Sequence, residues 1–369
     1  MKLNKGKTMK KIIAMLSVVL FSFGVAKAGE LTITGSAKAS YAITSSDAAA
    51  AKVEQDKGLG ISNEFTLGAS GELDNGFTWS YAIDLDTVES TATNDDAKLT
   101  LTTPQGTFGV FLGEGGLGVD NAASQSVISR PSDTSYGELM FDTFDIDGFD
   151  NIQYHTPAGL IPFGTTIKIG HAPNATASAA NDFKATGAAN DGVATADTTI
   201  TDGVTADAGG SSVTQYQVKI AEIPMLEGLT VGADYFEAHD VNGANDQEPE
   251  SGAYYATLAV GPAVIGYSES FYAAAMGNIT TEQIEKIENK KYSIGFNVND
   301  DLSFSYENEK SNPHLSKATA SYEMESNGIQ AAYTMGGMTL GVAMNNHENA
   351  SYTQNNDVKD TVFTVEMAF

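Results

Sequence analysis

The chain has 369 residues, of which 47 are acidic and 20 are lysine or arginine, and its formal net charge is −27. A charge of this sign and size disfavours nucleic acid and other anionic partners and favours cations. The chain has no cysteine, which excludes disulfides and thiolate metal sites.

The N-terminus has the three parts of a secretory signal peptide. Five lysines precede an apolar run from Ile12 to Val25, and Ala26-Lys27-Ala28 supplies an A-x-A cleavage site. This run is shorter than the roughly 20 apolar residues that a membrane-spanning helix needs. We therefore expect residues 1–28 to be removed and residues 29–369 to form the mature domain. Removal takes away six lysines and no acid, which changes the net charge to −33.

From Leu31 to the C-terminus, short segments alternate between apolar and polar residues. Successive side chains of a strand point to opposite faces, so each segment predicts a strand with one apolar face. An apolar face toward lipid requires a closed barrel, because an open edge would leave backbone groups unpaired in hydrocarbon. The alternation along each predicted strand assigns one group of residues to the outer face of the barrel (Trp79, Tyr81, Phe304, Tyr306 and Phe363) and another to its inner face (Ser80, Ser305 and Thr364).

The gaps between the predicted strands alternate between short turns and long polar loops. A literal reading gives 17 strands, whereas single-chain bacterial barrels have even strand counts. If residues 317–325 and 329–335 form one strand with a bulge at Ser326-Asn327-Gly328, the count becomes 16. We therefore predict an all-β fold, a 16-stranded antiparallel transmembrane β-barrel. Thr280 and Gln283 have the spacing of a capping box and favour a short surface helix over Ile284 and Ile287.

The longest loop, residues 172–212, is rich in alanine, threonine, aspartate and glycine. This composition predicts a solvated surface segment. Calcium binding by its acids stays open, although they lack the spacing of an EF-hand.

Two stretches beside the third long loop resemble the general, usually trimeric, porins of Gram-negative bacteria. Residues 106–113 read GTFGVFLG and residues 150–157 read DNIQYHTP, where that family has a G-x-F/L-G strand and an N-S-x-R-Y-x-S/T-P strand. The signal peptide with its following LTITG strand and the C-terminal Phe369 are also similar to the family. One position departs from it, because Gln153 stands where the family has arginine, and Arg130 is the only arginine of this chain.

The resemblance implies a barrel of 16 strands whose third loop folds inward and narrows the pore. It also implies a homotrimer in the lipid of the cell outer membrane, with small hydrophilic solutes diffusing passively through each barrel. Cations become the favoured solutes if the acids of the inward loop form a negative ring.

The predicted pore constriction combines acids of the third long loop with basic residues of the loop and the wall. These residues are Asp133, Glu138, Asp142, Asp145, Asp147, Arg130, Lys38 and Lys168. The alternative is a solvated outer loop whose acids have no role in the pore.

The sequence favours a channel over an enzyme. None of the five histidines lies in a nucleophile motif or in a metal-ligand spacing such as H-E-x-x-H. We therefore predict no catalytic residue, no cofactor and no metal ligand. Two other functions stay open, a substrate-specific channel and a surface or adhesive barrel without transport. The first needs an ordered track of aromatic or basic residues, and the inward positions have few aromatics, mainly Phe111 and Phe236.

Overall fold

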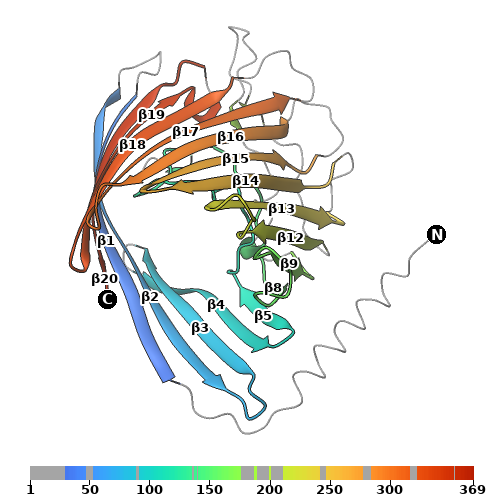
Figure 1. The fold of residues 1–369 in the computed structure, drawn as a ribbon. Helices are drawn as coiled ribbons and strands as arrows, with labels where there is room; N and C mark the ends of the chain where they lie inside the picture. Colours follow the sequence, from blue (N-terminus) through green and yellow to red (C-terminus); the bar gives the residue numbers. More distant parts are fainter. Residues whose placement is uncertain are drawn as a thin grey trace.

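The computed structural model describes residues 30–46, 53–88, 91–134, 137–138, 140–175, 187–188, 199–200, 211–241, 247–276, 284–315, 322–352 and 354–369. The predicted signal peptide, residues 1–28, therefore lies outside the described residues. Sixteen strands within the described ranges form one closed antiparallel barrel, as predicted (Figure 1). No helix within these ranges is long and apolar enough to cross a membrane.

The barrel strands follow one another in chain order, and each pairs with its neighbours. They are β1 (Glu30–Ser46), β2 (Val53–Glu72), β3 (Thr78–Val88), β4 (Thr91–Thr103), β5 (Gly106–Leu112), β8 (Asn151–His155), β9 (Thr166–Ala172), β12 (Ser212–Ile220), β13 (Leu229–His239), β14 (Glu250–Val260), β15 (Ala263–Ala273), β16 (Ile284–Asn297), β17 (Leu302–Leu315), β18 (Met324–Met335), β19 (Met338–Glu348) and β20 (Val358–Ala368). Two further pairs form small separate sheets, β6 (Asp133–Thr134) with β7 (Gly137–Glu138) and β10 (Gly187–Ala188) with β11 (Thr199–Ile200).

The barrel closes where the first and last strands meet, β1 beside β20 (Figure 1). Phe369 continues this seam beyond the last strand. Its N–H donates to the carbonyl of Gly35, and the N–H of Gly35 donates to the carbonyl of Phe369, each at 2.9 Å. The ring of Phe369 also lies 5.4 Å from the ring of Phe65 in β2. The last residue of the chain is therefore part of the closure.

Deleting Phe369 should lower the yield of folded, heat-resistant barrel. The deletion removes two backbone hydrogen bonds of the seam, each contributing about 0.5–1.5 kcal/mol, and one aromatic contact of similar size. The measurement is the fraction of protein that keeps its folded mobility on a gel without boiling. Phe363→Leu is the control, because it changes an outward side chain of β20 and leaves the backbone hydrogen bonds of the seam intact. An unchanged yield after the deletion would count against a role of Phe369 in closure.

Side-chain alternation gives the barrel an apolar outer face and a polar inner face, as predicted from the sequence. Exposed fractions are 42% for Tyr81, 41% for Phe304, 43% for Tyr306 and 46% for Phe363, against 4% for Ser305 and 7% for Thr364. Trp79 shares the face of Tyr81 in β3, and Ser80 on the opposite face bonds to Thr100 of β4 at 2.7 Å. The predicted register is confirmed for all eight residues.

Two local predictions were wrong. Along its described pairs, β18 has no register shift against β17 or β19, so the strand contains no bulge. Met324 is fully buried in a cluster inside the barrel, so an apolar residue at an inward position explains the apparent change of phase. Ile284 and Ile287 lie in β16 rather than in a helix, and both are buried in the same cluster. Residues 280–283 lie outside the described ranges.

Candidate functional site

The segment between β5 and β8, residues 113–150, is called the inner loop here because it lies against the polar face of the strands. Its backbone N–H groups bond to wall side chains, from Val119 to Asp234 of β13 at 3.3 Å, from Val127 to Ser305 of β17 at 3.0 Å and from Ile128 to Gln330 of β18 at 2.9 Å. This face is opposite to the exposed aromatic side chains, and in a closed barrel it is the lumen. The inner loop therefore follows the inner wall from β13 to β18.

Glycine in the wall lets the loop lie directly on the sheet. A Cβ at Gly266 of β15 would overlap the carbonyl oxygen of Ala123, a residue of the inner loop. Ser293 of the neighbouring β16 donates to the same carbonyl at 2.5 Å. Any larger residue at position 266 would push the loop away from the wall.

The second part of the inner loop, residues 140–150, leads back to β8 and is called its returning half. It is held by apolar packing. The ring of Phe144 lies 5.2 Å from the ring of Phe236 in β13 and 4.2 Å from the ring of Tyr272 in β15. Ile146 is fully buried, and its N–H donates to Gln215 of β12 at 2.9 Å. Part of the lumen is thus filled by a small apolar core. The predicted inward aromatic Phe236 belongs to this core and is fully buried.

Five charged residues, which we call the anchor cluster, tie the two halves of the inner loop to the wall. The members are Asp120, Arg130 and Asp142 of the loop, Lys291 of β16 and Glu309 of β17. Asp142 lies 2.5 Å from Arg130 and 2.6 Å from Lys291, Arg130 lies 3.3 Å from Glu309, and Lys291 lies 3.5 Å from Asp120. The side chain of Lys291 is 3% exposed and that of Glu309 is fully buried. Removing one partner of such a buried pair typically costs about 3–5 kcal/mol.

The charge on Asp142 is fixed by this cluster. Burial disfavours the ionised form, but the positive charges of Lys291 and Arg130 outweigh burial and hold the pKa of Asp142 well below its ordinary value. Asp142 is therefore an ionised anchor. It is not a free acid that faces the pore.

Beside the anchor cluster is a cavity of about 350 Å³, which we call the acidic cavity. It is lined by Asp120, Asn121, Arg130, Asp133, Asp142, Thr143, Asp145 and Asp147. Five of the eight predicted constriction residues meet here, namely Arg130, Asp133, Asp142, Asp145 and Asp147. Asp133 and Asp147 are exposed.

Asp145 has a structural role as well. Its carboxylate accepts the N–H groups of Leu117 at 2.7 Å, Gly118 at 2.5 Å and Ile146 at 2.6 Å, and so joins the outgoing and returning halves of the inner loop. Burial, and then the nearby charge of Asp147, raise the pKa of Asp145 to about 6, although these backbone bonds oppose the shift. Near neutral pH Asp145 still carries a negative charge.

The other three predicted site residues are not among those that line the acidic cavity. Lys38 lies in β1, opposite Ser62 of β2 and Glu366 of β20. Lys168 lies in β9, where the charges of Lys219 and Asp145 act on it. Glu138 lies in β7 with its backbone opposite Asp133, and its side chain is outside the part that the structure describes.

Lys291 and Glu309 were not predicted from the sequence as functional residues. Both stand at inward positions, two residues from the inward-facing Ser293 and Ser311 respectively. The available signal in the sequence was a charged residue at an inward position, since Lys291 stands in a row with Asn289 and Ser293, and Glu309 in a row with Glu307 and Ser311. Gln153, which stands where the resembling family has arginine, donates to the carbonyl of Gly115 and holds the start of the inner loop without a charge.

Comparisons with known proteins support the fold. No family model matches the chain, and no curated protein matches it. Solved structures do match. A loop-deletion mutant of OmpT, an outer membrane protein of Vibrio cholerae, has a TM-score of 0.62 at 12% identity, covering 93% of this chain and 100% of its own. The anion-selective porin from Comamonas acidovorans has a TM-score of 0.62 at 12% identity, covering 92% of this chain and 100% of its own.

The OmpF of Salmonella typhi, solved in complex with daunomycin, has a TM-score of 0.61 at 11% identity, covering 92% of this chain and 98% of its own. These likenesses extend over almost the whole of both chains, and identities this low show the fold alone. Together with the closed barrel of sixteen strands among the described residues, they establish that this chain has the fold of the outer-membrane porins.

Proposed function

We propose that the protein is an outer-membrane porin, a water-filled and cation-selective channel through which small hydrophilic solutes diffuse passively. The observation that carries the proposal is the acidic cavity, in which the exposed acids Asp133 and Asp147 face open space. The one positive charge of this lining, Arg130, is already bound to Asp142 and Glu309. A field of one sign inside a low-dielectric channel concentrates counter-ions, so the cavity favours cations.

Basic residues of the wall oppose this field only in part. Lys98 of β4 is bound to Glu114, and the charges that act on Lys168 of β9 are the base Lys219 and the acid Asp145. One solved structure of this fold is named as an anion-selective porin, so the fold alone does not determine the sign of selectivity. In this chain the selectivity must come from its own side chains, and its acids outnumber its bases 47 to 20.

The test is the zero-current potential across a planar bilayer that separates two KCl concentrations. We expect a sign that shows potassium preference. The preference should be strong near 0.1 M salt, where the Debye length is about 10 Å, and should weaken near 1 M, where it is about 3 Å. A sign that shows chloride preference would refute the proposal, and an absence of conductance would favour a surface barrel without transport.

We also propose how the protein is exported, where it resides and how it assembles. Residues 1–28 direct export, the apolar outer face lies in outer-membrane lipid, and three copies form a homotrimer. A trimer form of OmpT from Vibrio cholerae with a TM-score of 0.61 and 11% identity supports the last point. Transport needs no catalysis and no cofactor.

A further inference from the structure

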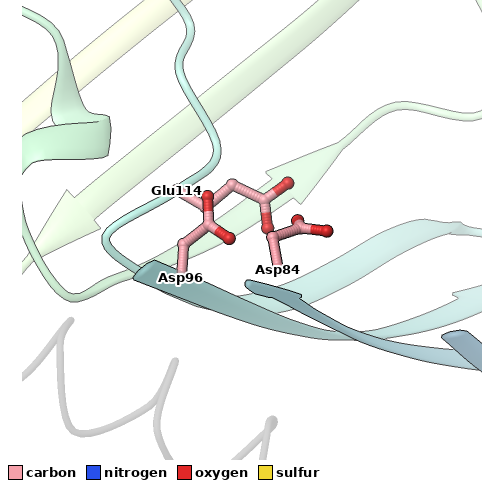
Figure 2. A group of neighbouring side chains, drawn as sticks. All are labelled: Asp84, Asp96 and Glu114. Carbon is pink, nitrogen blue, oxygen red and sulfur yellow. The ribbon is translucent and has the colours of Figure 1, made fainter. Parts of the chain in front are cut away.

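Three carboxylates meet at the start of the inner loop, away from the acidic cavity. They belong to Asp84 of β3, Asp96 of β4 and Glu114, and one oxygen from each lies within 4.8 Å of the others. Figure 2 shows the three acidic side chains as neighbours. Asp84 and Asp96 are direct partners across the strand pair, and Glu114 is presented between two glycines with positive φ, Gly113 at 64° and Gly115 at 91°.

The charges of this group do not balance. Like charges directly opposite one another in a sheet are destabilising. Lys98 binds Oε1 of Glu114 and lies near the two aspartates, so it supplies one positive charge against three carboxylates. Two negative charges remain at the site, which is the charge that one divalent cation would neutralise.

Two oxygens of the group are buried and have no partner. Asp84 is only 9% exposed, and its Oδ1 is buried without a hydrogen bond. Oε2 of Glu114, the oxygen that Lys98 does not hold, is also buried without a partner. A buried polar atom without a hydrogen bond costs about 1–3 kcal/mol, and more if it is charged. These atoms point to a ligand with positive charge.

We propose that Asp84, Asp96 and Glu114 bind a divalent cation of the calcium class. Hard oxygen ligands suit Ca²⁺, which tolerates irregular geometry and completes its shell with carbonyls and water, whereas Mg²⁺ demands a near-ideal octahedron. Bound there, the ion joins β3 and β4 to the root of the inner loop. This role is independent of ion selectivity, because the three ligands do not line the acidic cavity.

The site is tested on the complete folded barrel in detergent, freed of metal with EDTA and titrated with CaCl₂ in a calorimeter. We expect the parent to show one saturable site and a higher unfolding temperature with Ca²⁺ than without it. Asp84→Asn and Glu114→Gln should each weaken this binding by about tenfold or more, since even the outer-shell partners of metal ligands contribute that much. MgCl₂ should bind more weakly than CaCl₂.

Two further variants separate a built site from general attraction of cations to an acidic protein. Asp133→Asn combined with Asp147→Asn removes two negative charges from another place, one more than either ligand variant, and should leave the saturable site unchanged. Lys98→Met removes the competing ammonium and should tighten binding. Each variant is first shown to fold by its heat-resistant mobility, and Glu114→Gln, which changes a loop residue, keeps the test possible if Asp84→Asn does not fold. A parent without saturable binding, or variants that bind alike, would overturn the proposal.

Discussion

A channel in which methionine replaces Arg130 should conduct more current than the parent and fluctuate between levels. Arg130 holds Asp142 and Glu309, and the substitution leaves Glu309 fully buried without its cation. A loss of about 3–5 kcal/mol from a buried pair changes the balance between a docked and a released inner loop by more than about a hundredfold. Because the loop fills part of the lumen, its release widens the pore.

Single-channel recording in planar bilayers measures this effect. Lys310→Met is the matched control, because Lys310 on the outer face lies 2.8 Å from Glu325 but its side chain is 39% exposed. An exposed ion pair is worth about 0–1 kcal/mol, so the control should conduct like the parent. If the Arg130 variant shows the steady conductance of the parent, the anchor cluster does not hold the loop.

Replacing Asp133 and Asp147 together by asparagine should reduce the preference for cations and leave the barrel folded. Both acids are exposed in the acidic cavity, so their charges act on the pore and contribute little to stability. Asp142→Asn is expected to behave differently. It weakens the contact of Asp142 with Arg130 in the other half of the loop and with Lys291 of the wall, so conductance should change along with selectivity.

The readout is the zero-current potential in a KCl gradient at low and at high salt. Glu325→Gln, which removes one acid from the outer face, is the control and should keep the potential of the parent. The difference between the double variant and the parent should be largest at low salt, because screening removes it near 1 M. A double variant with the potential of the parent would mean that other charges determine the selectivity.

The barrel was predictable because one simple rule applies to every strand of a barrel whose outer face meets lipid. Outward positions such as Phe304 and Phe363 must be apolar, and the alternation fixes the register. The errors occur where the lumen breaks this rule. Met324 and Ile287 face inward and are apolar because the returning half of the inner loop packs over that side of the wall. Periodicity alone cannot distinguish a residue under such a loop from one facing lipid.

The acids of the site were predictable, but their roles were not. Asp133, Asp142 and Asp147 stand close together in sequence, and only the fold makes one an anchor and leaves the others exposed. The partners that decide this lie far away, since Glu309 is 179 residues from Arg130 and Lys291 is 149 residues from Asp142. No local spacing relates residues so distant, so the pairing had to come from the structure.

The contacts of the inner loop also determine the order of assembly. Val119 bonds to Asp234, Ser124 to Glu307 and Ile128 to Gln330, across 115, 183 and 202 residues of chain. Contacts between residues so far apart in the sequence form slowly. The chain loses conformational entropy when the long segment between them closes, before the contacts can compensate for this loss. The loop cannot dock until β13, β17 and β18 have taken their places. The loop is therefore expected to narrow the lumen in a late step of assembly, after β13 to β18 have paired.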